Sequence, residues 1–293
     1  MTPRANAFQH FVLTRFNVDL GGHRRSWDDA WLASRFELFR AWCHPSMREQ
    51  SEQRFTWIVF FDASSRATVE PMLAGLPPMP NLHVEFTRGV FGPETARRAV
   101  EARYDGSSAT LLSTRLDCDD ALRADVVARL RAEASEATRE VLNFPLGYQV
   151  ADGRFYVTFD PMNAFCTLVE PWAPDSITTV YGAQHQDIGS LAPVRQVCWS
   201  PSWVQVIHGE NLANKVQGVR TARRRAAAHF GNLPALAALP PREGGRELLR
   251  DVVRSAGTVG HKLVTHPAAR RRTAALVRLP RRSHRRGDAA RRR

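Results

Sequence analysis

Short apolar runs alternate with helical segments in the first part of this chain, and this alternation constrains the fold more than any other feature. The run Thr56–Phe61 is almost wholly apolar, which is typical of a strand buried on both faces of a sheet. Further strands are predicted at Phe11–Val18, Leu82–Phe86 and Ala109–Leu116, with helices at Trp31–Trp42 (expected to end at Pro45), Ala67–Ala74 and Glu94–Tyr104. Strands that alternate with helices predict a mostly parallel sheet with helices on both faces.

The second half of the chain has a different pattern. A helix is predicted over Ala121–Arg139, followed by hairpin strands at Phe144–Tyr148 and Gly153–Phe159 and a last strand at Ser202–His208. The expected fold class is therefore α/β, with a mixed, mostly parallel sheet flanked by helices. Such sheets bind ligands beyond the carboxyl ends of their strands. The segments after Val18, Phe61 and Leu116 are where we expect the chemistry.

Charge is divided unevenly along the 293 residues. Residues 219–293 have 20 Lys/Arg against 4 Asp/Glu, a net charge of +16, whereas residues 1–218 have 21 against 25, a net charge of −4. We therefore expect a folded domain over 1–218 and an Arg/Ala-rich extension over 219–293, helical around Arg246–Ser255 and disordered at its end. Because the domain is slightly acidic, nucleic acid is not expected to be the main ligand.

Cysteine spacing and hydropathy favour the reducing interior of a cell. No two of the four cysteines, Cys43, Cys118, Cys166 and Cys198, form a C-x-x-C pair, so neither a zinc knuckle nor a redox pair is indicated. No apolar run approaches the roughly 18 residues of a membrane span. The first residues lack the apolar segment of a secretory signal. A cytoplasmic protein is expected.

Three carboxylates follow the strand predicted to end at Leu116, namely Asp117, Asp119 and Asp120. Like charges this close repel each other and are usually compensated by a cation or a cationic ligand. Hard divalent cations such as Mg²⁺ or Mn²⁺ prefer carboxylate oxygens and bridge to substrate phosphates. In an extended chain, Asp117 and Asp119 share one face and Asp120 takes the other. The alternative is that Asp119 and Asp120 cap the helix predicted from Ala121.

Two further polar residues stand at predicted strand ends. Asp62 ends the strand Thr56–Phe61, where it could accept hydrogen bonds from a nucleobase or a ribose, or else cap the next helix. His208 ends the last predicted strand. A neutral imidazole there is a suitable third ligand for a metal held by carboxylates. The alternative is a hydrogen-bonded histidine at a turn.

The remaining candidates are bases and phosphate-binding residues. Glu170, His185 and Asp187 are the candidate general bases, and the alternative for each is a solvated or capping residue. Arg15 and Arg115 lie near the ligand-facing strand ends, where arginine can pair with a diphosphate. Thr14 is grouped with Arg15 in this donor-binding set. For Arg115, the alternative is a structural ion pair with the acids that follow it.

Five segments occur in order along residues 8–218: Phe11–Asn17, Trp57–Asp62, Thr114–Leu122, Asn143–Tyr148 and Val206–Gly209. Together they resemble the putative rhamnosyltransferase family and, more broadly, the GT-A-like (Rossmann-like) glycosyltransferases. The resemblance does not include the Arg-rich extension.

The resemblance implies a hexosyltransferase that moves a sugar, rhamnose by the family's name, from a nucleotide-sugar donor to a hydroxyl of a glycan or lipid-linked acceptor. It also implies a divalent metal, Mn²⁺ or Mg²⁺. It assigns Asp62 to the nucleobase, Asp117 to the ribose, and Asp119, Asp117 and His208 to the metal site. Two other classes stay open: a nucleotide-binding module without turnover, and a nucleotidyltransferase.

The basic extension has three interpretations. Arg-rich segments bind the phosphates of nucleic acid without reading its sequence. Anionic lipid at the cytoplasmic leaflet is an equally good electrostatic partner, and we favour it, because acceptors in bacterial-type sugar transfer are often lipid-linked. This interpretation predicts a peripheral protein at the inner face of the plasma membrane. The alternative is a solvated tail without a partner.

Overall fold

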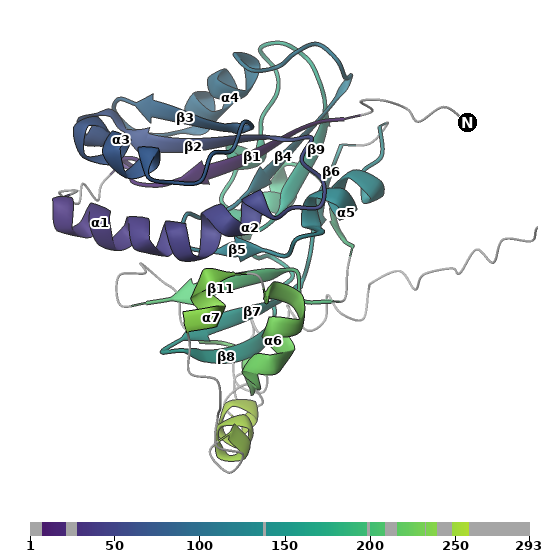
Figure 1. The fold of residues 1–293 in the computed structure, drawn as a ribbon. Coiled ribbons are helices and arrows are strands. Elements are labelled where there is room, and N and C mark those ends of the chain that lie inside the picture. The colour runs from purple at the N-terminus through teal and green to yellow at the C-terminus, as the bar shows by residue number, and fades with distance from the viewer. Residues whose placement is uncertain are drawn as a thin grey trace, which may run out of the picture.

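The computed structural model describes residues 8–21, 28–136, 139–197, 200–208, 216–231, 233–238 and 248–257. Its strands form two sheets, a seven-stranded sheet and a five-stranded one, which lie one above the other in Figure 1. No helix among these residues is long and apolar enough to cross a bilayer.

The larger sheet holds the parallel core that the sequence predicts. Its strands are β1 (Gln9–Arg15), β2 (Thr56–Asp62), β3 (Leu82–Thr87), β4 (Thr110–Arg115), β6 (Glu140–Asn143), β9 (Thr167–Pro171) and β10 (Val194–Gln196), in the spatial order β10-β6-β9-β4-β1-β2-β3. β4, β1, β2 and β3 are parallel neighbours, and β9 runs antiparallel between β4 and β6. The expected fold class, a mixed and mostly parallel sheet flanked by helices, is confirmed.

Helices cover both faces of this sheet because its strands are apolar on both. α1 (Asp29–Leu38), α3 (Arg66–Ala74) and α5 (Val126–Glu133) pack in one core, and α4 (Pro93–Glu101) packs in the other. Neighbouring residues of β2 alternate between the two cores: Trp57 and Val59 lie in the first, Ile58 and Phe60 in the second. This is the two-residue period of a pleated strand.

Two expected helix boundaries are wrong. Pro45 does not end the first helix, because a π-helical segment, Phe39–Cys43, leads into α2 (His44–Arg48), with Pro45 in the first turn of α2. Because Pro45 has no N–H donor, it interrupts the regular hydrogen-bond ladder of this continuous helix, and the π-helical segment stands directly before it. The helix expected over 121–139 is replaced by a short strand, β5 (Ala121–Leu122), and by α5, which starts at Val126. Strand pairing in the second sheet overrides the helical pattern at Ala121.

The second sheet contains the predicted hairpin. Its strands are β5, β7 (Leu146–Ala151), β8 (Arg154–Phe159), β11 (Trp203–Ile207) and β12 (Val219–Thr221), in the order β12-β8-β7-β11-β5. Two short helices follow, α6 (Arg223–Phe230) and α7 (Pro234–Ala238). Phe230 and Leu236 are buried against this sheet together with Phe155. The extension expected from residue 219 therefore begins with a strand and helices of the folded body.

Residues 248–257 are also helical, close to the expected 246–255. The disorder expected at the end of the extension falls outside the described residues. Cys43, Cys118 and Cys166 are buried free thiols, and burial raises the pKa of each. Cys198 lies outside the described residues.

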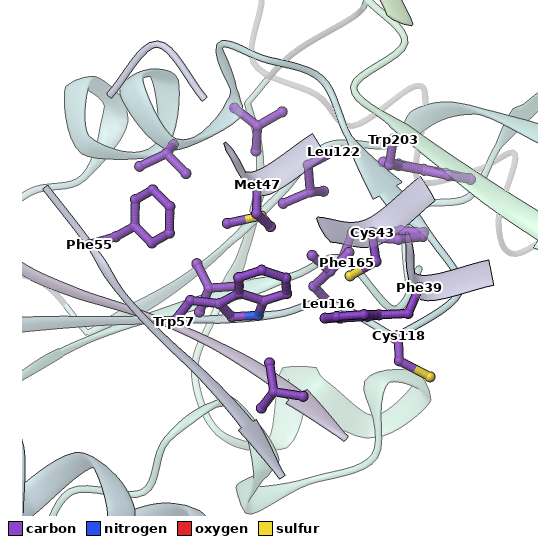
Figure 2. Close-up of a cluster of buried hydrophobic side chains, with 14 of the residues drawn as sticks. Phe39, Cys43, Met47, Phe55, Trp57, Leu116, Cys118, Leu122, Phe165 and Trp203 are labelled. Atoms are coloured by element: carbon purple, nitrogen blue, oxygen red, sulfur yellow. The ribbon is translucent and has the colours of Figure 1, made fainter. Parts of the chain in front are cut away.

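A buried aromatic cluster joins the larger sheet to the second one (Figure 2). Phe39 packs against Trp57 of β2, with ring centroids 5.6 Å apart. Phe165 stacks on Trp203 of β11 at 4.7 Å. Leu116 and Cys118 belong to the same cluster of buried residues. The end of β4 is therefore held by the core on both sides of Asp117.

Candidate active-site cleft

The acidic segment after β4 forms a tight turn. The backbone N–H of Asp120 donates to the carbonyl of Asp117 at 3.2 Å, so the segment is not the extended strand that the alternation argument assumes. Leu116 and Cys118 are buried in the core, and all four residues from Asp117 to Asp120 contribute to the lining of a cleft.

This turn lies at the junction of the two sheets. β5 follows it directly and pairs antiparallel with β11, Ala121 opposite Val204. Asp120 extends this contact, because its Oδ1 accepts the backbone N–H of Val206 at 2.8 Å. Burial, and then the charge of Asp119, raise the pKa of Asp120. The alternative that Asp119 and Asp120 cap a helix is wrong, since α5 begins only at Val126.

The cleft has a volume of about 570 Å³ and two chemically different sides. One side carries charged and aromatic groups from the larger sheet and α1: Arg15, Arg35, Arg115, Asp117, Asp119 and Tyr181. The other carries mostly neutral polar groups from the second sheet and its loops: Gln149, Thr158, Asp160, Asn163, Gln205 and Gln217. The charged side suits a phosphorylated ligand, and the amide side suits hydroxyl groups.

Asp119 and His208 meet as the sequence predicts, because the pairing of β5 with β11 brings the end of β11 to the acidic turn. His208 Nε2 lies 2.8 Å from Asp119 Oδ2. A third group, Arg35 of α1, reaches the same oxygen, with its Nη1 at 2.5 Å from Oδ2 and 3.0 Å from His208 Nε2. A carboxylate, an imidazole and a guanidinium thus converge on one point.

The donor set fits a divalent cation in part. A carboxylate and an imidazole at one point are suitable ligands, and Mg²⁺ and Mn²⁺ commonly complete their shells with substrate phosphates and water. Asp117, the third expected ligand, is bound instead to Arg115. The described part of the chain contains no group of three or more His, Cys, Asp or Glu that could hold a metal ion.

Asp117 forms the centre of a second charged cluster. Arg115 donates to both carboxylate oxygens of Asp117 at 3.1 Å, which is the structural ion pair considered for Arg115. Burial alone would raise the pKa of Asp117, but the guanidiniums of Arg115 and Arg15 outweigh it and lower the pKa. Arg15 lies over the ring of Tyr181, 4.9 Å from its centroid, and has no carboxylate partner among the described residues.

His185 also lines the cleft. Burial, and then Arg115, lower its pKa below 6.5, so the ring is neutral at pH 7. Arg115 Nη1 faces its Nδ1 at 3.4 Å. A guanidinium can only donate, so this contact favours the tautomer with a lone pair on Nδ1 and the proton on Nε2. In that tautomer, Nε2 is a hydrogen-bond donor and not a base.

The other two candidate bases lie away from the cleft. Glu170 is 1% exposed, and its carboxylate accepts the backbone N–H groups of Thr178 and Thr179 at 3.0 and 2.9 Å. Asp187 is exposed and does not line the cleft. The structure therefore corrects both assignments: Glu170 holds a loop, and Asp187 is a solvated residue.

Two of the expected donor-binding residues are engaged in the protein itself. Thr14 is fully buried, and its Oγ1 accepts a hydrogen bond from Trp57 Nε1 at 2.9 Å, so it cannot contact a ligand. Asp62 caps the turn after β2, where its Oδ1 accepts the backbone N–H of Ser64 at 2.8 Å. This is the capping alternative, and a contact of Asp62 with a nucleobase stays a prediction.

Sequence reasoning missed Arg35 and Asp160. Arg35 lies within a helical stripe of aromatic residues, one turn after Trp31, and its guanidinium lies over that ring at 5.1 Å. A cation in an apolar stripe is the signal that could have marked it. Asp160 follows β8, and its Oδ1 accepts the backbone N–H of Met162 at 3.0 Å. Its Oδ2 accepts no hydrogen bond from the described residues, and no local sequence pattern distinguishes it.

The cleft brings arginines and an acidic turn together at the carboxyl edge of a mostly parallel sheet. The chain belongs to the family described as "Putative rhamnosyl transferase", whose match spans residues 22–220. That span includes the acidic turn and both His185 and His208. A search of the curated proteins finds no match.

Several solved structures are similar at low identity. TarS of S. aureus matches at 12% identity and a TM-score of 0.39, over 68% of this chain and 37% of that chain, so this chain spans little more than a third of it. A 4-diphosphocytidyl-2C-methyl-D-erythritol synthase matches at 14% identity and a TM-score of 0.36, over 77% of this chain and 97% of that one. The inositol-1-phosphate CTP transferase from T. maritima matches at 11% identity and a TM-score of 0.36, over 79% and 97%.

The structural role of Glu170 can be tested by its stability. Glu170→Gln keeps only one of the two carboxylate oxygens that accept backbone N–H groups, so we expect a loss of about 1–3 kcal/mol in the free energy of unfolding. Burial raises the pKa of Glu170 above its usual 4.5. The contribution of Glu170 to the free energy of unfolding is therefore fully present below pH 4.5, and it falls as the pH rises through the raised pKa of the folded state. In urea titrations, the difference in the free energy of unfolding between wild type and Glu170→Gln should be smaller at pH values above the folded-state pKa than below pH 4.5. If wild type and variant were equally stable at both pH values, the structural role of Glu170 would be contradicted.

Proposed function

We propose that this chain transfers a sugar from a nucleoside-diphosphate donor to a hydroxyl group of a glycan or lipid-linked acceptor, with rhamnose as the sugar that the family description suggests. The observation that supports it most is the cleft, where arginines and an acidic turn meet at the carboxyl ends of β1 and β4. The family match supports the same class of reaction.

The departing diphosphate is the group that this site must stabilise. Arg15 and Arg115 both lie over Tyr181, with their Cζ atoms 4.9 and 5.9 Å from the ring centroid. Charge-assisted hydrogen bonds from arginine to phosphate are strong and directional. Because Arg15 has no carboxylate partner among the described residues, its charge is available to the donor without the breaking of an ion pair.

A divalent cation, Mn²⁺ or Mg²⁺, remains part of the proposal, and Asp119 and His208 are the residues that would hold it. When bound, it would supply positive charge to the leaving diphosphate. Asp117 is proposed to face the ribose, a role that its position in the cleft permits. His185 donates from Nε2 in the tautomer favoured by Arg115, so it can bind an oxygen of donor or acceptor.

We assign the general base to Asp160, because it is the cleft carboxylate that lies outside the acidic turn and has no ion pair among the described residues. Asp117 is bound by Arg115, Asp119 by Arg35, and Asp120 by the backbone of β11. The Oδ2 of Asp160 can accept the proton of an acceptor hydroxyl. Asp160 lies on the amide-rich side of the cleft, where Gln149, Gln205 and Gln217 suit a hydroxyl-rich acceptor.

The function is tested by the product released. Wild type should release a nucleoside diphosphate from its nucleotide-sugar donor, and Asp119→Ala should abolish this release, because Asp119 holds both Arg35 and His208. A thermal-shift screen of nucleotide sugars with Mn²⁺ and Mg²⁺ identifies the donor, and circular dichroism checks the fold of the variant. Release of pyrophosphate would indicate a nucleotidyltransferase. Nucleotide binding without turnover would indicate a nucleotide-binding module. Full activity of Asp119→Ala would refute the proposed site.

The base assignment makes a separate prediction. Asp160→Asn should lower kcat by roughly 10²–10⁴-fold, the usual contribution of general base catalysis, with little change in nucleoside-diphosphate affinity. Asp187→Asn is the matched control, because this exposed carboxylate lies outside the cleft, and it should keep wild-type kcat. If Asp187→Asn or Glu170→Gln lost kcat while Asp160→Asn kept it, the base would be misassigned.

We also propose that the basic extension contacts anionic membrane. Since β12 and α6 belong to the folded body, the deletion that tests this should begin after Gly257. Residues 258–293 contain 12 Lys/Arg and one Asp, a net charge of +11, and each basic residue near an anionic surface contributes about 1 kcal/mol. Full-length protein should co-sediment with phosphatidylglycerol vesicles at low salt and not with phosphatidylcholine vesicles. Equal binding by the deleted chain would remove the proposal.

A further inference from the structure

Arg35 occupies the point at which the expected cation ligands converge. Its Nη1 lies 2.5 Å from Asp119 Oδ2 and 3.0 Å from His208 Nε2. A guanidinium remains charged at any pH the protein experiences and can only donate hydrogen bonds. The position nearest to both predicted ligands is therefore already held by a positive charge that belongs to the chain.

The position of Arg35 is built from several elements. α1 presents it from a helix whose Leu32 and Phe36 are buried in the core. Trp31, one turn earlier, supports the guanidinium from the face of its ring. The Arg35 side chain is 12% exposed and its Asp119 partner 9%, so the ion pair is shielded from water and is stronger than a surface pair. These contacts hold the guanidinium in one place.

We propose that Arg35 is the resident cation of the Asp119–His208 pair, and that a divalent metal ion binds there only by displacing its guanidinium. Arg35 then determines the metal affinity of the site, because each binding event must break the ion pair with Asp119. The inference itself concerns only metal binding. It rests on the proposed function only where it links metal binding to the diphosphate of the donor.

That connection follows from the position of Arg35 in the cleft wall. A displaced guanidinium needs another anion, and the diphosphate of a donor is the anion that the proposed function brings into the same cleft. Metal and nucleoside diphosphate should therefore bind cooperatively, each favouring the other by the same factor. Without the diphosphate, the ion pair keeps the metal affinity low.

The test is a Mn²⁺ titration of the full chain, with free Mn²⁺ followed by electron paramagnetic resonance. Arg35→Gln should bind Mn²⁺ about tenfold or more tightly than wild type, because a charge-assisted pair no longer opposes the metal. Arg35→Lys, which keeps the charge, should stay close to wild type. Arg15→Gln is the matched control, because it removes one charge from the same cleft without touching Asp119, and it should change the affinity much less.

Two further measurements keep the proposal testable if Arg35→Gln folds poorly. Trp31→Ala removes the ring behind the guanidinium and should raise Mn²⁺ affinity in the same direction by a smaller factor. In wild type, uridine, thymidine or guanosine diphosphate should tighten Mn²⁺ binding, and the enhancement should shrink in Arg35→Gln.

Equal or weaker Mn²⁺ affinity in Arg35→Gln and Trp31→Ala would overturn the inference, as would no Mn²⁺ binding by any variant. The titration needs no sugar donor. If the Mn²⁺ affinities did not change as expected but the enzyme released nucleoside diphosphate normally, the inference about Arg35 would be wrong and the proposed function would stand. If the Mn²⁺ affinities changed as expected but no donor was turned over, only the proposed function would be refuted.

Discussion

The junction between β5 and β11 is the contact on which the rest of the site depends. Two antiparallel residue pairs hold β5 against β11 within the second sheet, directly after the acidic turn that follows β4 of the larger sheet. The hydrogen bond from the Val206 N–H to Asp120 extends this pairing by one step. This contact places the end of β11 against the turn after β4, so that residues nearly ninety positions apart meet at hydrogen-bond distance. Behind it, the stacked rings of Phe165 and Trp203 fill the space between the sheets. A shift of β11 by one residue would turn His208 away from Asp119.

Charge balance explains the composition of the cleft. Three carboxylates within four residues repel each other, and burial raises the cost of each charge. The chain compensates with one arginine on Asp117 and another on Asp119, while Asp120 is bound to backbone and has a raised pKa. The result is a site in which every acid of the turn already has a partner. A phosphorylated ligand would enter by rearranging these partners, whereas Arg15 has no ion pair with a carboxylate among the described residues that would have to be broken.

The site was predictable where a local pattern expressed a physical need. Three acids after a buried strand require compensation, and the segments around Asp117, Asp119, Arg15, Arg115 and His185 all reached the cleft. Glu170 and Asp187 did not, because a carboxylate beside a strand or in a turn looks the same in sequence whether it faces a ligand, a backbone loop or solvent. The prediction that Thr14 binds the donor was wrong for a related reason. Side chains alternate along β1, so Thr14 is buried while the neighbouring Arg15 faces the cleft. Asp160 was not predicted, because only the contacts of the other cleft carboxylates distinguish it from them, and no sequence pattern shows those contacts.

The sequence alone determined the parallel core of this protein, since continuous apolar runs separated by amphipathic helices have few other ways to bury their surface. It also placed an acidic cluster at the edge of that core, because Asp117, Asp119 and Asp120 directly follow an apolar strand. The tertiary structure decided the partners of that turn. Because of the pairing with β11, Ala121 lies in a strand and not in the expected helix, and His208 lies beside Asp119. The packing of α1 places Arg35 at the same Oδ2 atom of Asp119. Those contacts depend on how distant segments pack against each other, so the spacing of residues along the chain does not predict which side chains contact Asp119.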